Sequence, residues 1–132
     1  MHEIYGWVLL SESTRDIDEG GLKRKVQKIQ DQCNKAEWEL WAPGKLEVIL
    51  NNGTYKLTVH AISDREGSES KDFHAILNNV VAELPGSYGV IYETVQQDHD
   101  GYGAGSYKVF VVRRGRIEVH QDPFLSPRNK FI

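Results

Sequence analysis

Hydrophobic residues in this chain alternate with polar ones in short runs, and in two longer runs they recur at three- and four-residue spacing. Alternation predicts strands and the longer spacing predicts helices. Helices are expected over residues 22–33 and 73–84, the second ended by Pro85-Gly86. Asn52-Gly53 and Arg114-Gly115 predict tight hairpin turns. Strands are expected over residues 3–10, 37–41, 45–51, 54–62, 87–95, 107–113 and 116–121.

The order of these elements predicts an α+β fold. We expect a single, mostly antiparallel sheet of six or seven strands, with both helices packed on one face. Two helices cover only one face of a sheet, so the other face would present Trp and Tyr side chains. Such a surface indicates a partner-binding site, unless sheet coiling or the C-terminal segment covers it. Both interpretations stay open at this point.

Composition narrows the class of protein. A length of 132 residues predicts one domain, residues 1–132, with a real core. The net charge of −3 argues against a nucleic-acid partner, which usually requires a basic stripe. The single cysteine, Cys33, allows no internal disulfide. No signal peptide or long apolar run is visible, so we expect a cytoplasmic protein that does not enter a membrane.

No catalytic, cofactor or metal site is predicted. None of the five histidines has the spacing of a metal motif. Residues 98–101 begin like a calcium loop, but the bidentate Glu that such a loop needs does not follow. One alternative is a small enzyme that uses His60 or His120 with a sheet carboxylate, Glu93 or Glu118. Another is a ligand-binding or regulatory module with residues 101–105 as a lid.

Aromatic and acidic residues lie close together in two segments, and they are the candidate partner-binding residues. Aromatic side chains anchor an interface, and carboxylates steer a basic partner toward it. The candidates are Glu37, Trp38, Glu39 and Trp41 in a predicted strand, and Asp98, Asp100 and Tyr102 in a glycine-rich loop.

The C-terminal bracket, residues 122–127 with sequence DPFLSP, is stiffened by Pro123 and Pro127. It holds Phe124 and Leu125 in a fixed position after the last strand. We expect these two side chains to dock back onto the sheet and fix the final hairpin, so that loss of the Phe124 ring would destabilise the protein.

Several short motifs carry a resemblance that spans most of the chain. Tyr5-Gly6-Trp7, Ser87-Tyr88-Gly89, Arg114-Gly115 and the bracket occur in the order typical of the Imm7 family. This family comprises immunity proteins of bacterial polymorphic toxin systems. The resemblance implies a non-enzymatic, cytoplasmic protein that binds a cognate toxin domain and neutralises it by occluding its active site. Residues 128–132 are basic and apolar where the family pattern is acidic, so no acidic-tail role is assigned.

Overall fold

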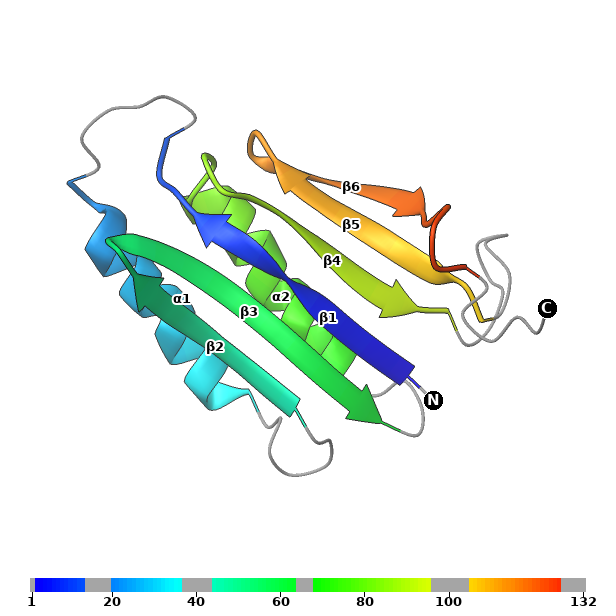
Figure 1. The fold of residues 1–132 in the computed structure, drawn as a ribbon. Helices are drawn as coiled ribbons and strands as arrows, with labels where there is room; N and C mark the ends of the chain where they lie inside the picture. The colour runs from blue at the N-terminus through cyan, green and yellow to red at the C-terminus, as the bar shows by residue number, and fades with distance from the viewer. Residues whose placement is uncertain (1, 14–19, 37–43, 64–67, 96–104, 127–132) are drawn as a thin grey trace.

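The computed structural model describes residues 2–13, 20–36, 44–63, 68–95 and 105–126 (Figure 1). The elements run in the order β1 (His2–Leu10), α1 (Leu22–Lys35), β2 (Gly44–Asn51), β3 (Thr54–Ser63), α2 (Ser68–Glu83), β4 (Tyr88–Thr94), β5 (Tyr107–Arg113) and β6 (Arg116–Gln121). The predicted strand over residues 37–41 lies outside the described residues. Helix α2 begins at Ser68, before the predicted start at residue 73. Hydrophobic spacing did not detect its first turn, because residues 68–71 are all polar.

The six strands form one antiparallel sheet in the order β2-β3-β1-β4-β5-β6, which confirms the predicted α+β fold. The first strand of the chain therefore lies near the middle of the sheet. Both helices lie behind the sheet in Figure 1, with α1 behind β2 and β3, and α2 behind β1 and β4. Among the described elements, no helix lies on the opposite face, as the order of the elements predicted.

The core lies between the helices and the sheet. Each helix contributes a stripe of buried side chains, which is the usual reason that an amphipathic helix is stable in a protein. The buried hydrophobic residues on the helices are Val26, Ile29 and Cys33 of α1 and Phe73, Ile76, Leu77 and Val80 of α2. The sheet residues that belong to this core are Ile4, Val8, Leu10, Leu57, Val59, Ala61, Ile91 and Val112.

Two glycines explain the close contact between β1 and β4. A Cβ atom added to Gly6 would lie 2.2 Å from the backbone oxygen of Val90, and one added to Gly89 would lie 2.1 Å from that of Trp7. In the antiparallel register Gly6 is opposite Ile91 and Gly89 is opposite Val8. The motifs around residues 6 and 89 are thus two halves of one strand contact, and glycine is required in each.

None of the helices in the described part of the chain is both long enough and apolar enough to cross a membrane.

Candidate partner-binding face

The helix-free side of the sheet, here called the open face, is built by strand alternation. Residues 4, 8 and 10 of β1 are buried beneath the helices, so residues 3, 5, 7 and 9 point the other way. The neighbouring strands follow the same rule in register. The resulting aromatic, histidine and acidic side chains of the open face are Glu3, Tyr5, Trp7, Glu47, His60, Tyr88, Tyr92, Tyr107, Glu118 and His120.

A tyrosine cluster, Tyr5, Tyr92 and Tyr107, lies near the middle of this face. The rings of Tyr5 and Tyr92 stack with centroids 5.3 Å apart and planes 7° from parallel. Tyr107 meets both rings edge-on, at 5.8 Å from Tyr5 and 5.9 Å from Tyr92. Tyr5 and Tyr92 are direct cross-strand partners, which places their rings together. These contacts hold all three rings in one arrangement.

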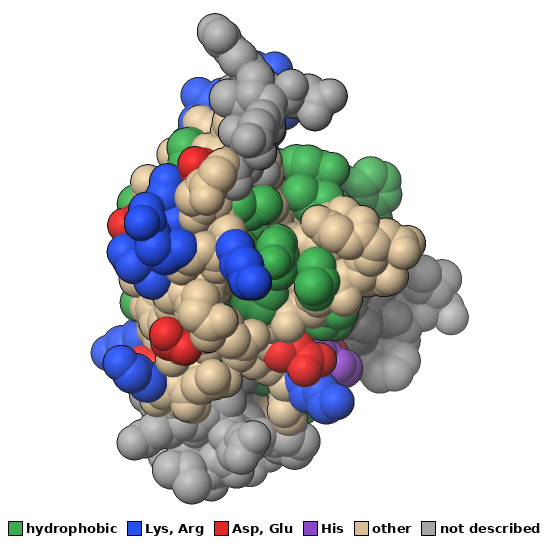
Figure 2. Space-filling model, turned by 90° about the vertical axis from the view of Figure 1, so that its left-hand side faces the viewer, with side chains coloured by type: hydrophobic (Ala, Val, Ile, Leu, Met, Phe, Trp, Pro, Cys, Tyr) green, Lys and Arg blue, Asp and Glu red, His purple; other side chains and the backbone are tan. Residues whose placement is uncertain are grey.

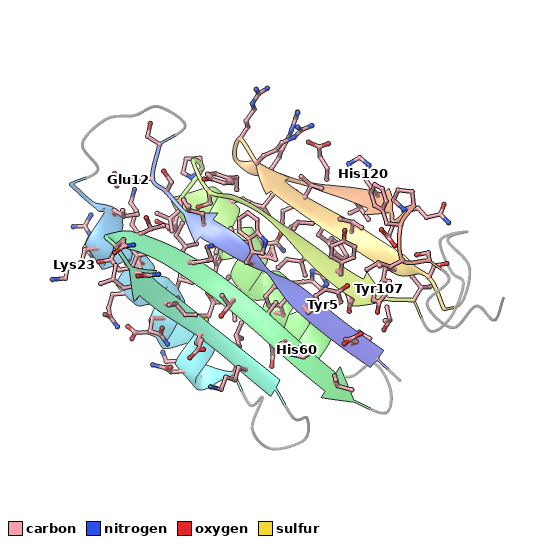
Figure 3. The ribbon with its side chains drawn as sticks, viewed as in Figure 1. Tyr5, Glu12, Lys23, His60, Tyr107 and His120 are labelled. Carbon is pink, nitrogen blue, oxygen red and sulfur yellow. The ribbon has the colours of Figure 1, made fainter. Side chains whose placement is uncertain are left out.

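A pocket of about 330 Å³ opens beside this cluster, lined by Glu3, Tyr5, His60 and Tyr107. The Tyr107 hydroxyl donates a hydrogen bond of 3.0 Å to Glu3 Oε1. His60 Nε2 lies 3.6 Å from the other oxygen, Glu3 Oε2. Figure 3 shows Tyr5, His60 and Tyr107, which come from three different strands, on the side of the sheet away from the helices.

Two carboxylates place negative charge near Tyr5 in this pocket. Burial raises the pKa of Tyr5 above its usual value, and the negative charges of Glu3 and Asp122 raise that pKa further. A nearby carboxylate disfavours the phenolate and favours a cation in the same place. The pocket therefore combines aromatic walls with nearby carboxylate charge that favours a cation.

Farther along the open face, Trp7 and Tyr88 form a second aromatic contact. Their ring centroids are 6.2 Å apart at an angle of 83°. The Nζ of Lys56 lies 5.0 Å from the centroid of the Trp7 ring, at cation–π distance. Trp7 is 37% exposed and Tyr88 is 50% exposed. At this end of the sheet the aromatic side chains remain available to a partner.

The C-terminal bracket differs from expectation in which of its residues is buried. Phe124 is 82% exposed and Leu125 is 47% exposed, so the prediction that they dock onto the sheet is wrong. Asp122 is buried instead, and its carboxylate accepts hydrogen bonds from the Phe124 and Leu125 amides and from the Ser126 hydroxyl. Aspartate often closes turns in this way. These hydrogen bonds hold the bracket in its conformation without any contribution from the Phe124 ring.

The bracket is also attached to the start of β5. The Tyr107 amide donates to Ser126 Oγ at 2.8 Å, and the Asp122 amide donates to the Tyr107 carbonyl at 3.1 Å. Tyr107 is buried, whereas Trp7 and Tyr88 are not. The aromatic face is therefore exposed only in part: Tyr107 is buried, Tyr5 and Tyr92 are half-buried, and Trp7 and Tyr88 are exposed.

Histidine–carboxylate pairs occur on both faces, but not all in the expected combinations. Glu93 is buried on the helix side, where His2 Nε2 lies 2.7 Å from Oε2 and His74 Nε2 lies 2.8 Å from Oε1. His60 and His120 lie on the opposite face, so a site that combines either of them with Glu93 is wrong. Strand alternation determines this result, because position 93 is one residue out of phase with the open face.

The pair of His120 and Glu118 does form, at 3.3 Å. Glu118 is also bound by the Arg113 guanidinium at 2.7 Å, and this contact, followed by His120, lowers the pKa of the carboxyl group. A carboxylate held ionised by arginine is a weak general base and a poor proton donor. This pair is therefore poorly suited to acid–base chemistry.

Basic side chains gather away from the tyrosine cluster, on the exposed side of α1. Lys23, Arg24 and Lys28 are exposed there, and Lys25 lies 3.7 Å from the Glu12 carboxylate. Figure 2 shows Lys and Arg side chains mostly on the left and exposed hydrophobic side chains on the right. Figure 3 shows Lys23 and Glu12 at one end of the molecule, away from Tyr5. The helix α1 thus presents a solvated charged surface.

Comparison with protein families shows which family the chain belongs to. The family model of Imm7, described as immunity protein 7, matches residues 1–132, the whole chain. The chain belongs to the immunity protein 7 family. No curated protein and no solved structure matches it significantly. The resemblance carried by the short motifs is thereby confirmed.

In this immunity protein 7 family member, the motifs have identifiable structural roles. Gly6 and Gly89 allow β1 and β4 to approach, and the aromatic residues next to them, Tyr5, Trp7 and Tyr88, point onto the open face. Arg114 and Gly115 both have positive φ, at 52° and 72°, as the hairpin between β5 and β6 requires. The bracket is organised by Asp122.

The residues predicted to bind a partner all fall outside the described part of the immunity protein. Glu37, Trp38, Glu39 and Trp41 lie in segment 37–43, and Asp98, Asp100 and Tyr102 lie in segment 96–104. Residues 101–104 of the possible lid are in the same segment. Within the described residues, no group of three or more His, Cys, Asp or Glu side chains is arranged to hold a metal ion.

Sequence reasoning singled out Tyr5 and Trp7 but missed Glu3, Tyr92 and Tyr107 as their neighbours. The available signal was alternation, since Tyr5 and Tyr92 are out of phase with Ile4 and Ile91. That signal assigns each side chain to a face of its own strand. It does not reveal that β1 lies beside β4, which is what brings the rings together.

Proposed function

We propose that this immunity protein binds the toxic domain of a cognate bacterial polymorphic toxin and neutralises it by covering the active site. The observation that carries the proposal is the match of the family model to the whole chain. The open face supports it, because exposed Trp7 and Tyr88 beside a fixed tyrosine cluster form a preorganised aromatic surface of the kind that anchors protein partners.

Neutralisation by occlusion requires no chemistry from the immunity protein. We therefore propose that the chain acts as one domain, in the cytoplasm, without catalysis of its own. The carboxylates best placed for acid–base work are already bound: Glu118 by Arg113, and Glu93 by His2 and His74. Residues 37–41 and 98–102 remain the proposed acidic and aromatic extension of the binding surface.

The test is co-expression of the immunity protein with the toxin domain that is encoded beside its gene. The toxin domain alone should stop bacterial growth, and co-expression of the immunity protein should restore it. The two purified proteins should also elute together in size-exclusion chromatography. Growth arrest that persists with the immunity protein present, together with separate elution, would refute the proposed function.

A further inference from the structure

We propose that the pocket lined by Glu3, Tyr5, His60 and Tyr107 binds a guanidinium group, and that its occupant is an arginine side chain of the toxin domain. The identity of the occupant rests on the proposed function, whereas the preference of the pocket for a guanidinium does not. The pocket then supplies the specific contact of the open face: a carboxylate with aromatic walls that receives one basic side chain.

Glu3 is held in position for this role. Its backbone amide donates to Thr94 Oγ1 at 2.9 Å, and its Oε1 accepts from the Tyr107 hydroxyl at 3.0 Å. Its side chain is 18% exposed, so the carboxylate is partly withdrawn from water but still reachable from the pocket. A partly buried carboxylate attracts a cation more strongly than a fully exposed one.

No lysine or arginine in the described part of the chain lies within ion-pair distance of Glu3; its described basic neighbour is His60, at 3.6 Å. The contrast is Glu118, which Arg113 binds at 2.7 Å and Arg116 approaches at 3.5 Å. Each carboxylate oxygen has two lone pairs, so the bond from Tyr107 leaves room at Oε1 as well as Oε2. As far as the described residues go, Glu3 therefore keeps acceptor positions for a guanidinium from outside.

The walls of the pocket favour a planar cation. Tyr5 is fixed by its stack on Tyr92, at 5.3 Å, and meets Tyr107 edge-on, at 5.8 Å. A guanidinium packs flat against an aromatic ring and pairs with a carboxylate through two parallel N–H groups. The same face already holds one cation over a ring, Lys56 over Trp7 at 5.0 Å. The charges of Glu3 and Asp122 oppose an anion at this position.

The first experiment uses small probes and the free immunity protein. Propylguanidinium and the neutral propylurea have almost the same shape, so NMR titration with each isolates the effect of charge. We expect saturable shifts at residues 3, 5, 60 and 107 with propylguanidinium, and at least fivefold weaker binding of propylurea. Equal binding of the two probes, or shifts centred elsewhere, would overturn the proposal whatever the toxin does.

The second experiment measures affinity for the toxin domain. Glu3→Gln removes the charge but keeps an oxygen that can accept from Tyr107, so the fold should survive; Glu83→Gln on α2 makes the same charge change away from the open face. We expect about tenfold weaker binding for Glu3→Gln and little change for Glu83→Gln. If both variants bind and neutralise like the parent protein, the pocket proposal fails while the proposed function stands.

Discussion

At the scale of single residues, burial decides which side chains carry stability, and it separates two phenylalanines. Phe73 is completely buried in the core, whereas Phe124 is 82% exposed on the bracket. A large apolar side chain contributes mainly through the surface it removes from water. The two rings therefore have different expected roles, stability for Phe73 and contact with a partner for Phe124.

Replacing each ring with alanine tests this difference. Phe73→Ala should lower the free energy of unfolding by about 3–5 kcal/mol, because it leaves a cavity, while Phe124→Ala should change it by less than about 0.5 kcal/mol. Urea unfolding followed by tryptophan fluorescence measures both. A large loss of stability in Phe124→Ala would contradict the exposed position. Unchanged stability with weaker toxin binding would identify Phe124 as a contact residue.

Cys33 provides a residue-scale prediction about pH. Burial raises the pKa of its thiol from 9.0 to about 11. The folded-state pKa is above the unfolded-state value, so the contribution of the protonated thiol is fully present below pH 9 and is lost as the pH rises toward 11. Over this range the free energy of unfolding should fall by up to about 1.4 kcal/mol per pH unit through this group.

The matched comparison is Cys33→Ala, which removes this titration and leaves every other group in place. Unfolding measured at pH 8, 9 and 10 should show a steeper loss of stability in the parent protein than in Cys33→Ala. Parallel pH profiles for the two proteins would contradict the raised pKa. In the folded protein at pH 8, Cys33 should also react with iodoacetamide far more slowly than free cysteine.

At the scale of elements, two contacts are important for the sheet: the contact between β1 and β4, and the attachment of the C-terminal bracket to β5. Gly6 of β1 and Gly89 of β4 let these two strands come close together, and the C-terminal bracket attaches to the start of β5 through Tyr107. The bracket has few buried apolar side chains, so its conformation depends on hydrogen bonds to Asp122. Hydrogen bonds to one buried residue therefore fix the bracket, a role that the sequence predicted for Phe124 and Leu125.

Replacing Asp122 should release the bracket. Asp122→Ala removes the acceptor of three hydrogen bonds and should lower the free energy of unfolding by about 2 kcal/mol or more. Asp122→Asn keeps one oxygen and should fall between Ala and the parent protein. Asp31→Ala, at an exposed site on α1, is the control and should have little effect. Equal melting temperatures for Asp122→Ala and Asp31→Ala would show that Asp122 does not hold the bracket.

At the scale of the whole molecule, the proposed function raises the question of which surface would bind a toxin domain. Exposed aromatic side chains of the open face and the acidic and aromatic segments at 37–41 and 98–102 are the proposed contributors. Anchoring side chains act mainly on dissociation, whereas charges at the rim act on association and its salt dependence. Kinetics therefore separate the two kinds of contribution even within one interface.

Charge reversal at Glu37 and Glu39 should slow association with a basic toxin domain and flatten its dependence on salt. Trp38→Ala or Trp41→Ala should instead speed dissociation, by about 2 kcal/mol if that residue is a hot spot. Surface plasmon resonance at several salt concentrations measures both rates. Trp7→Ala, on the open face, is the comparison: faster dissociation in that variant alone would place the anchor on the sheet rather than in segment 37–41.

The sequence by itself determined the type of nearly every described element, because these signals are local. Hydrophobic spacing located α1 and most of α2, alternation located the strands, and the pairs Asn52-Gly53 and Arg114-Gly115 located two hairpins. The antiparallel sheet with helices on one face followed from their number and order. The short motifs also identified the family. Two of them contain Gly6 and Gly89, which are needed because the backbones of β1 and β4 come so close together.

Only the tertiary structure decided which side chains meet. Tyr5 stacks on Tyr92 because β1 lies between β3 and β4, an order that no local pattern encodes. The same long-range pairing brings His2 to Glu93 and Tyr107 to Glu3. Likewise, the hydrophobic character of Phe124 suggested burial, but burial depends on whether a surface is within reach. The candidate pocket exists because three strands, distant in sequence, present their side chains at one place on the sheet.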